Sequence, residues 1–169
     1  MRNRTSLILF FLFVTVFPEC ISGKVVAGAG RFEQYLPFIQ GKRVGMVVNH
    51  TSVVGTGQTH LLDTLLKQHI NVVKVFAPEH GFRGNADAGE HVSSTIDSKT
   101  GVPILSLYNG KSKKPSEASM KKFDILIVDI QDVGLRFYTY YISMVRLMDA
   151  CAEYDRKKSK MYISRQMEL

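Results

Sequence analysis

The stretch FDILIVDIQDVGLRFYTYY, from Phe123 to Tyr141, decides the fold of this chain. Its first part, Phe123–Ile130, is almost entirely apolar and rich in Ile and Val, as in strands buried on both faces of a sheet. Polar residues and a glycine follow, and the apolar spacing of Tyr138–Tyr154 then predicts a helix. A buried strand, a polar turn and a helix form the repeating unit of α/β proteins.

Three other short apolar runs have the same character as Phe123–Ile130, and each is bounded by Gly, Pro, Asn or Asp. They are Arg43–Asn49, Asn71–Ala77 and Val102–Tyr108, and Lys160–Ser164 (KMYIS) is a candidate fifth strand. Helical patterns lie between the runs. We therefore predict an α/β fold with an open, mostly parallel, Rossmann-like sheet of four to five strands flanked by helices.

Three segments are predicted to be helical. Gln58–His69 places four leucines on one stripe, and Pro115–Lys122 has Pro115 in its first turn. The third helix, Tyr138–Tyr154, aligns apolar residues on one face: Tyr138, Tyr141, Ile142, Val145, Met148 and Ala152. The glycine-rich segment His80–Thr100 shows no period and is predicted to be a functional or mobile loop.

The chain has 169 residues and a net charge of +7, which invites a nucleic-acid-binding interpretation. The charge lies mainly at the two ends, because residues 24–155 hold fifteen basic and thirteen acidic residues. The predicted domain is therefore nearly neutral, and no nucleic-acid partner is expected. Two cysteines are too few for a disulfide-rich scaffold or a Cys-based zinc site.

The N-terminus has the pattern of a secretory signal peptide. Two arginines precede an uncharged run from Leu7 to Phe17, which is too short for a comfortable membrane span. We assign residues 1–23 to a signal peptide, so the protein is expected to be periplasmic or extracellular, with no stable membrane span after cleavage. An uncleaved anchor and a lipoprotein attached at Cys20 are the less favoured alternatives.

Polar side chains follow all four predicted strands. Because the carboxyl ends of parallel strands meet at one edge, where ligands of α/β proteins bind, these residues are expected to form a site. The set comprises Asn49, His50, Glu79, His80, Arg83, Asn109, Gln131, Asp132, Arg136 and Tyr138, with Glu90 in the long loop.

The same segments carry a family resemblance. GKRVGMVVNHTSV, FAPEHGFRG, DAGEHV, KTGVPILSLYNG and DILIVDIQDVGLRFYTYY resemble the DUF1343 family over about Gly28 to Arg156. That family includes NamZ-type exo-β-N-acetylmuramidases, which act on peptidoglycan fragments. Its members are much longer and add a C-terminal domain across a cleft. The resemblance therefore implies an N-terminal catalytic domain at residues 24–156, a divergent basic tail at 157–169, and a truncated chain.

Glycoside hydrolysis typically uses two carboxyl groups. Glu79 is the best candidate for the acid, on a glycine-bounded turn beside His80, and the resemblance also points to it. The alternative is that Glu79 forms a salt bridge with Arg83. For the second carboxylate, Asp132 ranks before Glu90.

His80 is assigned to catalysis together with Glu79 and Asp132, and the remaining site residues, Glu90 among them, are assigned to substrate binding. One of the arginines, Arg83 or Arg136, is expected to bind the lactyl carboxylate of N-acetylmuramic acid, because guanidinium pairs with carboxylate bidentately. Aromatic residues such as Tyr138 are candidates for stacking on the sugar. No metal or other cofactor is expected. The segment following the first strand, Val54–His60, resembles a dinucleotide fingerprint only weakly.

Two functions remain after these arguments. The first is an exported glycosidase that releases terminal N-acetylmuramic acid from peptidoglycan fragments during cell-wall turnover. The second is an inactive fragment or a muropeptide-binding module of the same family. A sheet that lacks a neighbouring domain is also expected to expose an apolar face and to associate.

Overall fold

The computed structural model describes residues 26–84, 94–108, 114–132, 134–135, 137–154 and 160–163. The predicted signal peptide lies outside these ranges, as do Cys20 and most of the predicted basic tail. Six strands form the main sheet, in the order β5-β6-β4-β1-β7-β8. Their bounds are Thr95–Ile96 (β5), Pro103–Ser106 (β6), Val72–Ala77 (β4), Val44–Val48 (β1), Ile125–Asp129 (β7) and Lys160–Ile163 (β8).

Five of these strands are parallel, and only β5 pairs in the antiparallel sense, with β6. The chain builds one half of the sheet outward from β1 through β4 to β6, and then returns to the other side of β1 to add β7 and β8. This reversal is the topological switch of Rossmann-like folds, and it lies between β1 and β7. The predicted fold class is therefore confirmed, including the fifth parallel strand at Lys160–Ile163.

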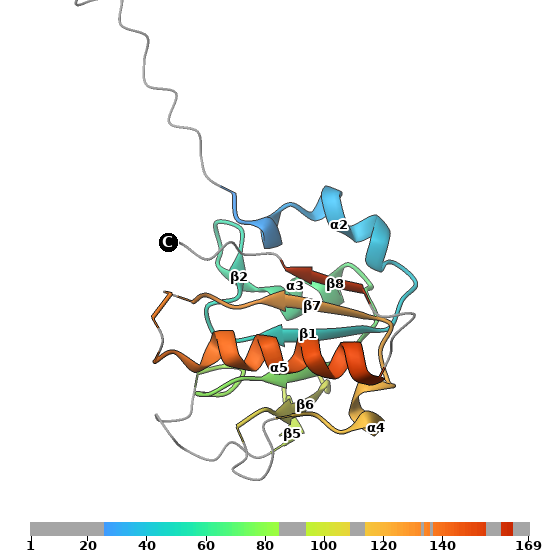
Figure 1. Ribbon diagram of the computed structural model, residues 1–169. Coiled ribbons are helices and arrows are strands. Elements are labelled where there is room, and N and C mark those ends of the chain that lie inside the picture. The colour runs from blue at the N-terminus through green and yellow to red at the C-terminus, as the bar shows by residue number, and fades with distance from the viewer. Residues whose placement is uncertain are drawn as a thin grey trace, which may run out of the picture.

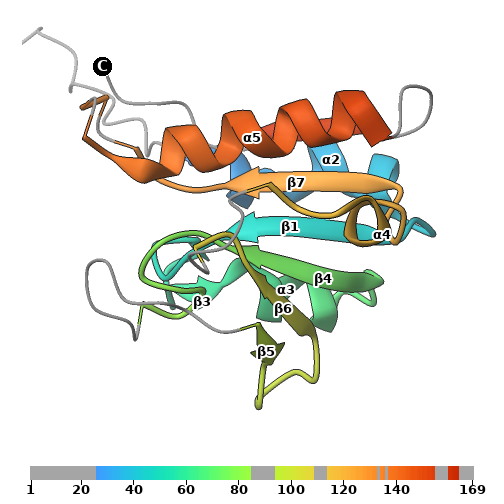
Figure 2. The same cartoon turned by 60° about the horizontal axis from the view of Figure 1, so that its bottom comes forward.

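Helices cover both faces of the sheet (Figures 1 and 2). On one face lie α2 (Phe32–Ile39) and α3 (Leu61–Lys67), preceded by the 3-10 turn η1 (Gly28–Gly30). On the other face lie α4 (Glu117–Met120) and α5 (Thr139–Tyr154), and α5 lies in front of the sheet in Figure 1, with its axis roughly along the strands. A short hairpin, β2 (Val53–Val54) with β3 (Thr59–His60), joins β1 to α3.

Alternate side chains of the central strands β1, β4 and β7 enter two separate cores. Met46 of β1 packs with the leucines of α3, whereas Val47 packs with Leu147 of α5. All five residues of β1 are buried, which explains its continuous apolar sequence. In the second core, the rings of Phe76 and Phe123 meet edge to face at 5.7 Å.

The predicted helix at Gln58–His69 begins later than expected, at Leu61. Its first residues instead form β3, and the backbone N–H of Leu61 donates to the carbonyl of Ser52. His60 caps the helix through its ring. The hairpin also replaces the strand–turn–helix that a dinucleotide-binding loop needs, so the weak fingerprint at Val54–His60 has no structural support.

The predicted helix at Pro115–Lys122 is also shorter in the structure. Ser116 is the N-cap of α4, and its hydroxyl accepts from the Ser119 N–H at 3.4 Å. Pro115 therefore precedes the helix instead of occupying its first turn.

The apolar face predicted on α5 is the outer face of the helix. Tyr141, Ile142 and Met148 are each more than 40% exposed, at 46%, 41% and 43%. The helix packs on the sheet through other positions, chiefly Leu147 and Ala150, both fully buried. The spacing of three and four residues therefore predicts the helix correctly, but the predicted apolar stripe lies beside the stripe that contacts the sheet.

Candidate functional site

The switch point between β1 and β7 is closed by the turn that follows β1. The side-chain oxygen of Asn49 accepts from the backbone N–H of Thr51 at 3.1 Å and from its hydroxyl at 2.7 Å. The hydroxyl of Ser52 donates to the carbonyl of Asp129 at the end of β7. Asn49 and Ser52 are fully buried, so their contacts hold the two strand ends together.

His60 supports this turn from the start of α3. Its Nε2 lies 2.9 Å from the carbonyl of Asn49, and its Nδ1 accepts from the N–H of Leu62 at 3.2 Å. The ring is therefore the neutral Nε2–H tautomer. Burial lowers the pKa of His60, although the hydrogen bond to Asn49 acts in the opposite direction.

Glu79 lies on a tight turn directly after β4. The N–H of Gly81 donates to the carbonyl of Pro78 at 3.1 Å, and His80 adopts a left-handed conformation at φ 67°. One carboxylate oxygen of Glu79 accepts from the hydroxyl of Thr139, the first residue of α5, at 2.6 Å. The turn thus brings the carboxyl group of Glu79 to the start of the helix that follows β7.

Asp132 follows β7 and is buried, with 7% of its surface exposed. Its two oxygens accept from different backbone N–H groups, at 2.8 Å from Gly134 and at 3.0 Å from Tyr141. These contacts fold the polar segment after β7 against the first turn of α5. The carboxylate of Asp132 therefore lies at the carboxyl edge, as predicted, and it also organises the loop there.

A second group of charges lies on the α3 face. Arg83 binds Asp97 bidentately, with nitrogen–oxygen distances of 2.9 and 2.8 Å, and also lies 3.5 Å from Asp63 of α3. Asp63 forms a further salt bridge with Lys99. The two hydrogen bonds from Arg83 hold the pKa of Asp97 below its usual value, even though burial acts to raise it.

The comparisons with known proteins identify the family. A family model described as "Exo-beta-N-acetylmuramidase NamZ, N-terminal" matches residues 44–163. This chain belongs to that family. The match begins at β1 and ends with β8, so it covers the whole parallel sheet and the site at its carboxyl edge.

Relatives of known sequence or structure agree with this membership. The peptidoglycan β-N-acetylmuramidase NamZ of Bacillus subtilis (strain 168) is 48% identical over 120 residues, which are 70% of this chain and 28% of that protein. Two crystal structures of DUF1343 family proteins from Bacteroides fragilis NCTC 9343 are also similar. One is 61% identical with a TM-score of 0.69 and covers 84% of this chain and 35% of that protein. The other is 35% identical with a TM-score of 0.71 and covers 82% of this chain and 34% of that protein.

The chain therefore spans about a third or less of the length of these NamZ-family relatives. None of the helices that the structure describes is long and apolar enough to cross a membrane. Within the same ranges, no three His, Cys, Asp or Glu side chains gather as a metal site would require.

Several predicted site residues lie together at the edge between β1, β4 and β7. The ring of His50 lies against Gly84, whose φ of +73° and lack of a side chain make room for it. Glu79 and Asp132 both contact the start of α5. Gln131 is exposed, and Tyr138 is 42% exposed, with its ring edge-on to Tyr140 at 6.4 Å.

Three other predicted site residues, Glu90, Asn109 and Arg136, lie outside the described residues. Arg83 is described, and its guanidinium binds the protein's own carboxylates. It therefore ties the turn after β4 to the loop before β6. These salt bridges explain the position of the Arg83 side chain, and no bound substrate is needed to explain it.

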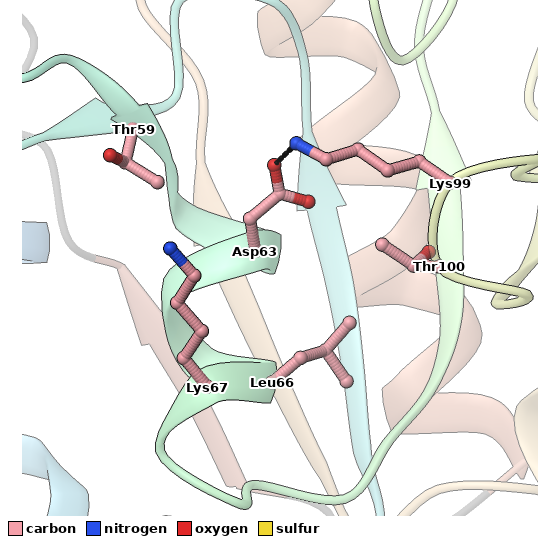
Figure 3. A pocket seen from close by; sticks show the side chains of 6 residues that line it. All are labelled: Thr59, Asp63, Leu66, Lys67, Lys99 and Thr100. Atoms are coloured by element: carbon pink, nitrogen blue, oxygen red, sulfur yellow. Dashed lines mark hydrogen bonds and ion pairs between the residues drawn. The ribbon is translucent and has the colours of Figure 1, made fainter.

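A cavity of about 430 Å³ lies beside α3 (Figure 3). Its lining includes Thr59, Asp63, Leu66, Lys67, Lys99 and Thr100. Figure 3 shows the ammonium group of Lys99 directed at Asp63, and this salt bridge neutralises the acidic group among these lining residues. Since neither Glu79 nor Asp132 contributes to this cavity, we place the candidate active site at the carboxyl edge instead.

Sequence reasoning missed several residues that organise the site. Thr139 lies in an aromatic run, a pattern that indicates stacking and not a hydrogen-bond donor. Asp63 lies in a leucine-rich helix, a pattern that indicates core packing. Asp97 lay in a long segment without a period. The only available signal was Thr139's place at the predicted start of a helix, where side-chain hydroxyls commonly form hydrogen bonds.

Proposed function

We propose that this chain forms the acid-bearing part of a glycosidase that releases terminal N-acetylmuramic acid from peptidoglycan fragments. The observation that carries the proposal is the position of Glu79, a carboxyl group held at the carboxyl edge of the sheet within a NamZ N-terminal fold. The name of the Bacillus subtilis relative, 48% identical to this chain, supports the same substrate class.

In the proposed reaction, Glu79 donates a proton to the oxygen of the leaving group as the glycosidic bond breaks. As this bond breaks, a second carboxyl group either activates a water that attacks the opposite face of the sugar, or attacks the sugar itself to form a covalent sugar–enzyme bond. In the second case a water activated by the ionised Glu79 then breaks that bond, and Glu79 regains its proton. Asp132 and Glu90 remain the candidates for that role from the sequence. The reaction needs no cofactor, and its product is the free terminal sugar.

Recognition of the muramic acid is proposed to depend on an arginine that pairs with its lactyl carboxylate. Arg83 already binds Asp97 and Asp63, so Arg136 is the better of the two candidates. Arg136→Ala is expected to weaken turnover of N-acetylmuramides more than that of matched N-acetylglucosaminides. An equal loss on both substrates would refute this assignment.

The direct test is hydrolysis of a chromogenic N-acetylmuramide by the purified chain and by Glu79→Gln. The proposal predicts release by the wild type and a loss of at least about 100-fold in the variant, the usual contribution of a general acid. Release at the same rate by both proteins would exclude Glu79 as the acid.

A binding module is the second candidate function. The observation that supports it is the polar carboxyl edge of the sheet, where Glu79 and Asp132 contact the start of α5, because such an edge suits sugar binding as well as catalysis. Calorimetric titration with a muropeptide distinguishes the two functions. Binding without release by the wild type supports the module, whereas release supports the enzyme.

Export is a separate proposal, based on the basic residues and the apolar run at the N-terminus. Expression in a bacterial host followed by N-terminal sequencing of the mature protein tests it. Cleavage near residue 23 and recovery outside the cytoplasm are expected, and an intact N-terminus on cytoplasmic protein would contradict it.

A further inference from the structure

The carboxyl group of Glu79 is held by a residue 60 positions away in the sequence. The hydroxyl of Thr139 donates to Glu79 Oε2 at 2.6 Å, a short and therefore well-formed hydrogen bond. Thr139 is itself fixed, because it begins α5, its carbonyl accepts from the Ser143 hydroxyl at 3.0 Å, and the next residue, Tyr140, is 9% exposed. Thr139 therefore presents its hydroxyl from a rigid position.

The segment that leads to Thr139 is fixed in turn by Asp132. One oxygen of Asp132 accepts from Gly134, before Thr139, and the other accepts from Tyr141, two residues after it. Each bond to a buried carboxylate is charge-assisted and therefore stronger than a neutral one. Both oxygens of Asp132 thus act on the backbone on either side of Thr139.

We propose that Thr139 is the positioning residue for Glu79, and that Asp132 holds the segment bearing Thr139 instead of serving as the second catalytic carboxylate. This inference rests on the proposed role of Glu79 as the acid. A threonine hydroxyl suits that task because it donates to the ionised carboxylate and accepts from the protonated acid. Thr139 can therefore keep the side chain of Glu79 in one place before and after proton transfer.

The test compares Thr139→Val, which keeps the shape and removes the hydroxyl, with Thr139→Ser, which keeps the hydroxyl. The side-chain carboxyl carbon of Glu79 is followed by ¹³C NMR during a pH titration, and Glu79→Gln identifies its signal. We expect the titration midpoint to rise by about half a unit in Thr139→Val, because the hydrogen bond to the ionised form is lost. Thr139→Ser should restore the wild-type midpoint.

Thr64→Val is the matched control, since the hydroxyl of Thr64, in α3, donates to the carbonyl of His60, the N-cap of that helix, at 3.2 Å. It should leave the Glu79 titration unchanged. The same midpoint in the wild type, Thr139→Val and Thr139→Ser would overturn the role of Thr139. This readout needs no turnover, so it is distinct from a failure of the proposed function, which the N-acetylmuramide assay detects.

The role of Asp132 is tested with Asp132→Asn, which retains only one acceptor oxygen. Hydrogen exchange at the amide of Gly134 or Tyr141 should quicken at least threefold, and any turnover should fall by about tenfold. A catalytic carboxylate would instead cost about a thousandfold or more. Unchanged exchange at both amides, or a thousandfold loss of turnover, would overturn this part of the proposal.

Discussion

Two groups of carboxylates lie on either side of the carboxyl edge of the sheet, and they are held in different ways. On the α3 face, Asp97 is bound by the guanidinium of Arg83, and Asp63 by Arg83 and Lys99. On the α5 face, Glu79 accepts from the hydroxyl of Thr139, and Asp132 accepts from backbone N–H groups. The first group is a network of salt bridges, and the second contains hydrogen bonds from uncharged donors.

This difference predicts separate roles for the two groups of carboxylates, the first in the stability of the fold and the second in the reaction. The pKa of Asp97 is lowered mainly by its hydrogen bonds with Arg83, so the group stays ionised and has no proton to give. A hydroxyl partner such as Thr139 accommodates both protonation states of Glu79. We therefore expect changes on the α3 face to alter the free energy of unfolding, and changes at Glu79 to alter turnover.

Arg83→Ala should give the largest change in stability. It leaves Asp97, which is 5% exposed, without its guanidinium partner, and should lower the free energy of unfolding by about 3 kcal/mol. Urea unfolding measures the loss. Arg43→Ala is the control, because Arg43 and Asp124 are 50% and 39% exposed and solvent screens their pair, so its loss should have little effect. Equal losses in the two variants would remove the distinction between the networks.

Gly84→Ala should have the next largest effect. An alanine Cβ at this position would lie 2.8 Å from Cγ of His50, in a backbone conformation of φ +73° that favours glycine. We expect a loss of about 2 kcal/mol, from the left-handed conformation and the contact together. Gly101→Ala shares the φ of +73° but meets nothing within 4 Å, so it should lose only about 1 kcal/mol. Matching losses in thermal unfolding would show that the contact with His50 is unimportant.

His60 should make stability depend on pH. Because burial holds its pKa below the ordinary value of 6.5, the unfolded chain binds the proton more readily than the folded one. The stabilisation is therefore complete above about pH 6.5 and is lost as the pH falls below it, by about 1 kcal/mol for each unit until the folded pKa is reached. Urea unfolding at pH 7.5 and 5.5 measures this slope.

His60→Leu should flatten that slope, and His69→Asn, a change at an exposed histidine, is the matched control. His69 has a positive φ of 58°, which asparagine tolerates, so the control keeps the backbone. A slope unchanged in His60→Leu would assign the pH dependence to another group.

The exposed stripe of α5 should affect association more than stability. Ile142 and Met148 are 41% and 43% exposed, so replacing both with Glu should change the free energy of unfolding by about 0.5 kcal/mol or less. The wild type is expected to associate through this apolar surface, and the double variant to remain monomeric in analytical ultracentrifugation. A wild type that is monomeric at high concentration would contradict this expectation.

The centre of the sheet was predictable because β1 and β7 are buried on both faces. Near-continuous apolar runs such as Val44–Val48 are typical of parallel strands, and the helical segments between the runs also predict parallel pairing. The start of α3 was less predictable. It depends on a hydrogen bond from Leu61 to Ser52, nine residues earlier, which local spacing does not reveal.

The position of the candidate site was also predictable, since strand ends in such sheets meet at one edge. The contacts between side chains within the site could not be predicted from the sequence. Glu79 and Thr139 are 60 residues apart, and Arg83 pairs with Asp97 in a segment without periodicity. Such contacts depend on how the loops fold over the carboxyl edge of the sheet. A sequence pattern indicates that a segment is a loop, but it does not indicate which distant residue that loop contacts.

The most direct test compares Glu79→Gln with Asp97→Asn, one change in each group of carboxylates. Turnover of a chromogenic N-acetylmuramide is measured per folded molecule, with the folded fraction taken from circular dichroism. We expect Glu79→Gln to lose at least about 100-fold in turnover with its melting temperature nearly unchanged. Asp97→Asn should melt earlier and retain its turnover. Full turnover in Glu79→Gln, or its abolition in folded Asp97→Asn, would contradict the account.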